Sequence, residues 1–110
     1  MKSNAFNRYK YSGDLYKYVT VNKGETITQE YFFAKRIPLK ASLQLNGSLM
    51  LKAEQKIEVG SLVSNIKDGD GNSILGDQVW ETTGLEPIVN SFSAIEEYRI
   101  RAIKFAGILN

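Results

Sequence analysis

The chain has 110 residues, of which 43% are hydrophobic and 24% charged, and its formal net charge is +2. This length allows one domain with a single core, and the composition is that of an ordinary globular protein. No run of about 18 apolar residues predicts a membrane span. The weak positive charge does not by itself indicate a nucleic-acid partner.

Two chemically important residue types are absent, because the chain contains no histidine and no cysteine. It therefore has no thiol nucleophile, disulfide or cysteine-based metal site, and it lacks the usual general base near neutral pH. The carboxylates mostly occupy alternating outward positions, and no two of them stand out as an unequal catalytic pair. We therefore predict a protein that is not an enzyme, with no catalytic residue, no cofactor and no metal.

Residues 1–13 are polar and show no apolar period, so we expect an N-terminal arm followed by a single β-domain over residues 14–110. The arm lacks the apolar block of a signal peptide, so we expect the protein to be used without secretion. Aromatic and basic side chains interleave here, which is the composition of a stacking surface for single-stranded nucleic acid. The basic residues do not cluster further, so we instead predict protein contacts. The predicted partner-binding residues are Phe6, Arg8, Tyr9, Tyr11, Tyr16, Tyr18 and, further along, Phe32.

Two segments, 15–21 and 25–33, are rich in β-branched and aromatic residues and are separated by Asn22-Lys23-Gly24. A three-residue loop with a left-handed Gly24 would pair Val19 with Ile27 and Leu15 with Tyr31. Three large aromatic side chains then fall on the other face, namely Tyr16, Tyr18 and Phe32. We therefore expect a ribbon that is covered on both faces, by a second sheet or by another chain.

Pro38 is expected to interrupt the ladder, because it has no N–H to donate. Residues 39–59 then alternate between apolar and polar side chains, which is typical of a half-buried ribbon that bends at Asn46-Gly47. A two-residue loop would mix the two faces. A three-residue loop with a left-handed Gly47 instead sets Leu43 opposite Leu49 on one face, and we expect both leucines in the core.

The loop at residues 67–73 resembles the start of an EF-hand, because Asp68, Asp70 and Asn72 occupy its first three ligand positions. The twelfth position is Val79, where a bidentate glutamate is needed. We therefore predict a polar turn between strands and not a calcium site.

A short strand is expected around Trp80, which we place in a core or an interface and not on a sugar-stacking platform. An irregular return follows over residues 85–90. Ser93 and Glu96 have capping-box spacing, so we expect a helical turn near 93–97 and then a strand from about 98 to 106. A full helix over this region is the alternative.

These patterns predict an all-β, antiparallel sandwich or jelly-roll-like domain of about six to eight strands, built on glycine-containing hairpins. We expect a structural or assembly protein that binds copies of itself or other proteins. The favoured setting is a small phage virion component, such as a capsid-decorating, head-fibre or tail protein, and otherwise the cytoplasm. The alternatives are a module that binds a carbohydrate, a receptor or nucleic acid, and a small inhibitor protein.

Overall fold

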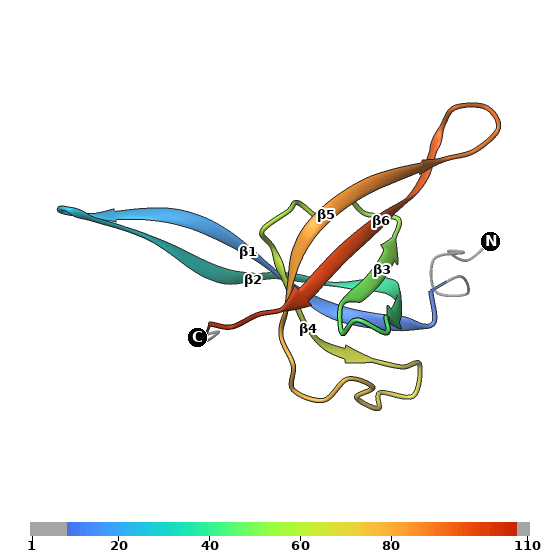
Figure 1. The fold of residues 1–110 in the computed structure, drawn as a ribbon, viewed down its shortest axis with the longest axis horizontal. Coiled ribbons are helices and arrows are strands. Elements are labelled where there is room, and N and C mark those ends of the chain that lie inside the picture. Colours follow the sequence, from blue (N-terminus) through green and yellow to red (C-terminus); the bar gives the residue numbers. More distant parts are fainter. Residues whose placement is uncertain (1–8, 108–110) are drawn as a thin grey trace.

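The computed structural model describes residues 9–107, which form six β-strands and no helix. The strands are β1 (Tyr11–Lys23), β2 (Thr26–Leu43), β3 (Leu49–Ala53), β4 (Leu62–Lys67), β5 (Trp80–Val89) and β6 (Ile95–Lys104). They pair antiparallel in the order β1-β2-β3-β6-β5-β4, and β4 returns to β1 (Figure 1). The all-β class is therefore confirmed, and the sheet closes on itself as one barrel where we expected two packed sheets.

The barrel interior is filled by the inward side chain of every second strand residue, as expected for so few strands. Trp80 is the largest of these side chains and is only 2% exposed, so its predicted place in a core is confirmed. The described residues contain no helix long and apolar enough to cross a membrane. The core consists of Leu15, Ile37, Leu39, Leu49, Leu51, Ala53, Ile57, Val63, Ile66, Trp80, Ile100 and Ala102.

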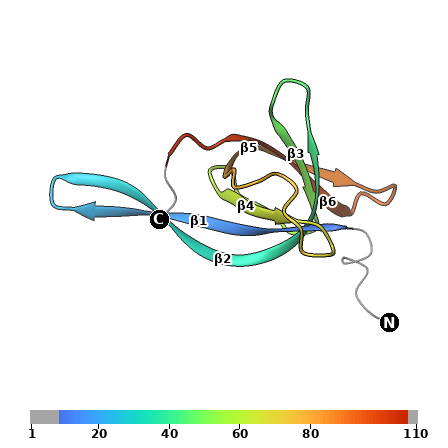
Figure 2. The ribbon, with the colours of Figure 1, turned by 90° about the horizontal axis from the view of Figure 1, so that it is seen from below.

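The β1–β2 and β5–β6 hairpins extend beyond the barrel, and the end of the β2–β3 hairpin also passes its rim (Figure 2). The distal part of β1–β2 projects to one side and that of β5–β6 to another, as both views show (Figures 1 and 2). The long β1–β2 hairpin gives the molecule its elongated form, with extents of 51 × 34 × 32 Å.

β1 and β4 meet at the seam that closes the barrel, and Gly13 makes this close approach sterically feasible. A Cβ atom at Gly13 would lie 3.1 Å from Val63 Cγ1, 3.2 Å from Leu39 Cδ2 and 3.3 Å from Ile66 Cγ1. These distances are shorter than ordinary van der Waals contact, so any larger residue would push the three core side chains apart. The missing side chain therefore lets β1 pack directly on the core beside β4.

Arg36 links three strands across the outer side of this seam. Its Nη1 donates to Asp14 Oδ1 at 2.7 Å and its Nε to Ser12 Oγ at 3.0 Å, both on β1. Its Nη2 donates to the backbone oxygens of Ser12 and, on β4, Asn65. Asn65 Nδ2 in turn donates to Asp14 Oδ2 at 3.1 Å, while its backbone has φ of 54°, a conformation that Asn tolerates better than most residues. This Arg36 network holds the irregular stretch of β4 against β1.

Replacing Arg36 with Ala should lower the free energy of unfolding by about 1–2 kcal/mol, because several charge-assisted hydrogen bonds at a partly exposed site are lost. The neighbouring Lys35→Ala change removes the same charge from an exposed position and should have an effect within about 0.5 kcal/mol. Urea denaturation of both variants measures the difference. Equal stability of the two variants would show that the network does not hold the seam.

The predicted register of the second ribbon is confirmed. Leu43 pairs with Leu49 and Ala41 with Leu51. Gln44 donates its N–H to Ser48 O, and Gly47 has φ of 88°, so the loop is the predicted three-residue form. The expected burial of Leu43 is wrong, because the hairpin end passes the barrel rim and leaves Leu43 56% exposed while Leu49 is 1% exposed. The strand also ends at Ala53 and does not continue to residue 59.

Leu49→Ala should destabilise the domain by about 2–5 kcal/mol, because it leaves a cavity in the core. Leu43→Ala, the same change on the directly opposite residue, should cost no more than about 0.5 kcal/mol at its exposed site. Chemical denaturation of the two variants, compared with the wild type, tests this assignment. A large loss of stability for Leu43→Ala would show that Leu43 is buried in the core, which would contradict its exposed position.

The predicted register of the first hairpin is wrong. Lys23 pairs with Thr26, so the loop is the two-residue Gly24-Glu25, and Gly24 has φ of 67°. A positive φ at the first loop position is what a type II′ turn requires, and that turn suits two-residue hairpins. Val19 consequently pairs with Glu30 and not with Ile27. The alternation of apolar and polar residues could not select the register here, because both faces of this ribbon are largely exposed.

Both prolines lie inside strands, contrary to our expectation. Pro38 is in β2 opposite Ser12, and pairing of β2 with β3 begins only at Lys40, so β3 needs no hydrogen bond from position 38. Pro87 lies in β5, within the part of the β5–β6 hairpin beyond the barrel, where β5 has β6 as its only described neighbour. The expected irregular return at 85–90 is therefore mostly strand. A proline is tolerated wherever its nitrogen faces an unpaired edge.

The C-terminal region is also strand where we expected a helical turn. Asn90 Oδ1 accepts the N–H groups of Phe92 and Ala94, and Ser93 has φ of 62°. Ser93 thus ends a tight β-turn over residues 90–93, and β6 begins at Ile95 and already includes Glu96. The predicted strand from about 98 to 106 is confirmed over most of its length, and the alternative of a full helix is wrong. The β5–β6 pairing shifts register beside Ala102, with the extra residue on β5 between Thr82 and Gly84, and Ile103 of β6 is 47% exposed.

Candidate interaction surface on the projecting ribbon

The projecting ribbon comprises residues 16–33, the part of the β1–β2 hairpin that leaves the barrel. The two strands are regularly paired from the turn as far as Tyr16 and Phe33, and a shift of register then places Leu15 opposite Lys35. The extra residue on β2 is Ala34. A bulge of this kind bends and twists a strand pair, which is consistent with the ribbon diverging from the barrel at this point (Figure 1).

One face of the ribbon carries an aromatic ladder at its root. Tyr16 stacks edge-on against Phe33 with ring centroids 5.7 Å apart, and Tyr18 lies against Tyr31 at 6.4 Å. Tyr31 also contacts Phe105, just after β6, at 5.6 Å. Edge-to-face pairs at these separations stabilise each other beyond simple burial. The ladder therefore anchors the ribbon root to the C-terminal end of β6.

A second contact anchors the β1 strand of the ribbon root, where Tyr18 packs on Gly60 in the loop between β3 and β4. A Cβ atom at Gly60 would lie 3.0 Å from Tyr18 Cε1, so the ring packs closely on the glycine backbone. Burial and, to a smaller degree, the Glu81 carboxylate and Tyr18 raise the pKa of Tyr31 above its ordinary value.

The opposite face and the tip of the ribbon are exposed. Phe32 is 48% exposed, Val19 49% and Ile27 68%. The charged side chains among them include Lys23 and Glu30, which form an ion pair at 2.9 Å. Phe33, on the aromatic face, is also 55% exposed. The ribbon thus exposes several large apolar side chains, and two of its charged side chains neutralise each other in an ion pair.

The predicted partner-binding residues separate into three groups. Phe6 and Arg8 lie outside the described residues. Tyr16, Tyr18 and Phe32 all lie on the projecting ribbon, but the expectation that they share one face is wrong. Tyr16 and Tyr18 share the aromatic face with Phe33 and Tyr31, whereas Phe32 pairs with Lys17 and points to the opposite face. Tyr11 begins β1 and Tyr9 lies just before it, at the end away from the ribbon tip. β1 thus already includes residues 11–13, which we had assigned to the arm.

Tyr9 is only 1% exposed and contacts its own chain. Its hydroxyl donates to Glu97 Oε1 at 2.8 Å, and Lys40 Nζ lies 5.4 Å from the centre of its ring, within cation–π range. Tyr11 is half-buried and packs against the core. In this structure both tyrosines fasten the start of β1 to the barrel and do not face outward.

Sequence reasoning missed other exposed residues of the ribbon. Val19 and Ile27 were placed opposite each other by the wrong register, and Phe33 was not singled out. Phe92, 88% exposed at the tip of the β5–β6 hairpin, was also missed. The available signal was Asn90 followed by a short loop, since Asn side chains commonly cap turns in this way.

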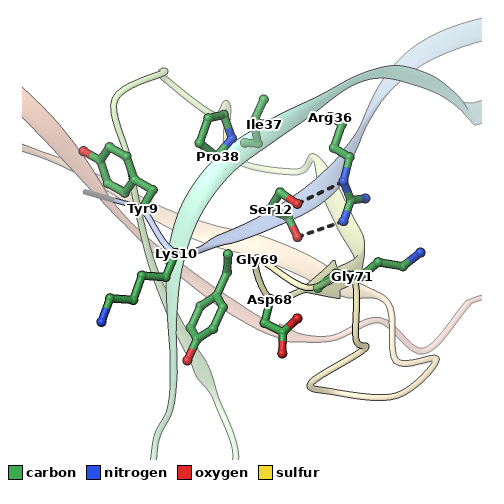
Figure 3. A pocket seen from close by; sticks show the side chains of 11 residues that line it. Tyr9, Lys10, Ser12, Arg36, Ile37, Pro38, Asp68, Gly69 and Gly71 are labelled. Atoms are coloured by element: carbon green, nitrogen blue, oxygen red, sulfur yellow. Dashed lines mark hydrogen bonds between the residues drawn. The ribbon is translucent and has the colours of Figure 1, made fainter. Parts of the chain in front are cut away.

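A groove of about 460 Å³ lies beside the seam, at the end of the barrel away from the ribbon tip (Figure 3). The Arg36 guanidinium is its most distinctive polar group, but its nitrogens already donate to Ser12, Asp14 and Asn65. The guanidinium is thus oriented by its own chain. The groove is lined by Tyr9, Lys10, Tyr11, Ser12, Arg36, Ile37, Pro38, Lys67, Asp68, Gly69 and Gly71.

The Asp68 loop folds as a turn whose carboxylate serves the backbone. Asp68 Oδ1 accepts the N–H groups of Asp70 and Asn72, each at 2.9 Å. Hydrogen bonds from the backbone, that of Asn72 foremost, lower the pKa of this carboxyl group. No group of three or more potential metal-ligating side chains was found within residues 9–107.

Calcium at millimolar concentration should not raise the melting temperature, because Asp68 Oδ1 is already hydrogen-bonded and Val79 cannot supply the closing carboxylate. Isothermal titration calorimetry and thermal denaturation with and without calcium measure this. The Asp70→Asn variant is the control, since it removes a potential ligand that makes no backbone hydrogen bond through its side chain in this turn. Micromolar binding that is lost in Asp70→Asn would contradict the turn assignment.

Comparison with known proteins identifies no relative of this chain: no family model, curated protein or solved structure matches it.

Proposed function

We propose that this chain is a non-enzymatic structural or assembly protein that acts through protein–protein contacts of the projecting ribbon. A small phage virion component, such as a capsid-decorating, head-fibre or tail protein, is the setting we favour. The observation that supports the proposal is the exposure of Val19, Ile27 and Phe32 on one two-stranded ribbon. Such a ribbon is marginally stable in water by itself, and aromatic side chains concentrate binding energy at protein interfaces.

The charge of the ribbon favours a protein over a nucleic-acid partner. Residues 16–33 contain two lysines and two glutamates, so their formal charge is 2 − 2 = 0. Lys23 is further neutralised by Glu30. Nucleic-acid sites usually place several cations along the phosphate backbone, and their affinity falls steeply with salt.

Incorporation into assembled particles tests the proposal. In cells that produce the particles, the wild-type chain should sediment with them in a density gradient, and Phe32→Ser should reduce its incorporation at least tenfold, because a central apolar anchor is lost. Leu45→Ser is the matched control, since Leu45 is a fully exposed apolar residue of the β2–β3 loop, away from the ribbon.

Two outcomes would overturn the proposal. The first is a wild-type chain that remains in the soluble fraction at the top of the gradient. The second is tight, strongly salt-dependent binding of a single-stranded oligonucleotide that Phe32→Ser abolishes, which would indicate a nucleic-acid protein instead.

A further inference from the structure

The outer edge of β2 along the projecting ribbon has no strand neighbour among the described residues. β2 pairs with β3 only from Lys40 to Leu43, so residues 26–33 pair with β1 alone. Because the turn is flanked by the hydrogen-bonded pair Lys23–Thr26, the backbone N–H and C=O groups of Ile27, Gln29 and Tyr31 point away from β1.

This edge lacks the usual features that prevent strand pairing. Natural sheets protect free edges with proline, lysine, bulges or very short strands. The stretch from Thr26 to Phe33 contains no proline, glycine or lysine, and its pairing with β1 is regular throughout. Its residues are also mostly β-branched or aromatic, the types that strands favour.

We propose that a second copy of this chain binds this edge, with the two β2 strands antiparallel about a two-fold axis at Gln29. The inference rests on the proposed function and names the partner of the ribbon. Pairing would convert two two-stranded ribbons into one four-stranded sheet, and three or more strands are what an isolated sheet needs for stability.

The sequence of the edge is self-complementary in this register. A two-fold axis perpendicular to the sheet keeps each side chain on its own face, so Ile27 meets Tyr31 of the second copy, and Thr26 meets Phe32. Pairs of a β-branched and an aromatic residue stabilise antiparallel strands. Thr28 meets Glu30 of the second copy, where a hydroxyl can donate to a carboxylate.

Neighbouring arrangements are less favourable. A register centred one residue later would set Glu30 against Glu30 of the second copy, and like charges directly opposite destabilise a sheet. The other edge of the ribbon, on β1, is partly covered by the loop before β4, where Tyr18 packs on Gly60. A register centred on Thr20 would also oppose two lysines, Lys17 and Lys23.

Self-association through this edge should be weak. About seven residues per copy take part, whereas a standard interface uses roughly 20–30 per side. We therefore expect a dimer that forms at concentrations on the order of 10–100 µM in solution and is strengthened by additional contacts within an assembly.

A charge swap at Gln29 tests the symmetry directly, because a residue on the two-fold axis faces its own copy. Gln29→Lys and Gln29→Glu should each weaken dimerisation at least tenfold in sedimentation velocity, whereas their equimolar mixture should associate again. Thr20→Lys is the matched control, since Thr20 is exposed on the same face, directly across the ribbon on β1. It should dimerise like the wild type.

Covalent capture gives a second readout suited to weak association. The chain contains no cysteine, so Gln29→Cys introduces a single thiol. Hydrogen-bonded antiparallel pairs place their Cα atoms about 5.5 Å apart, within the range that a disulfide spans. Mild oxidation should cross-link Gln29→Cys at least tenfold faster than Thr20→Cys.

The inference is overturned if the charge mixture does not restore association, if Thr20→Lys weakens the dimer as much as Gln29→Lys, or if both cysteine variants cross-link at the same rate. A chain that enters particles through Phe32 but fails these tests would retain the proposed function and require a different partner. A chain that dimerises as described but never enters particles would support the proposed dimer and contradict the proposed function.

Discussion

Closure of the barrel between β1 and β4 is the constraint on which the rest of the structure depends. Gly13 removes a side chain from the inner side of this seam, and the Arg36 network clamps its outer side through Asp14 and Asn65. Only four residue pairs join β1 to β4, and two join β4 to β5, so this part of the sheet has little ladder of its own. Side-chain hydrogen bonds therefore supplement a short ladder, and they fix the direction in which β1 and β2 leave the barrel.

The projecting ribbon depends on that direction and on two further contacts at its root. The bulge at Ala34 separates the ribbon from the barrel, and Tyr18 and Tyr31 then rest on Gly60 and Phe105. Beyond these contacts, the apolar side chains of Val19, Ile27 and Phe32 are not covered by any residue from 9 to 107. The barrel thus serves as the scaffold, and the surface that we propose for a partner lies outside it.

Much of the fold could be predicted from the sequence wherever one face of a strand is buried. The alternation of apolar and polar residues selected the correct loop and register around Gly47, because Leu49 and Leu51 must face the core. The same argument failed around Gly24, where both faces are exposed and a shifted register carries little cost. Ser93 was misread because its capping-box spacing also fits a turn with positive φ. Composition found Tyr16, Tyr18 and Phe32, whereas the burial of Tyr9 depends on Glu97, a contact 88 residues away that no local pattern reveals.

The aromatic ladder at the ribbon root implies a gradient of stiffness along the hairpin. Rings packed on Gly60 and Phe105 restrain its root, and Val19 and Thr20 still line a groove beside the loop before β4, whereas residues 22–30 are all exposed. Local opening should therefore be rare at the root and frequent towards the turn, and backbone amides near the tip should exchange with solvent much faster than those inside the barrel. Ordering this loose end is an entropic penalty that any partner must offset, and the fixed root confines that penalty to the residues near the turn.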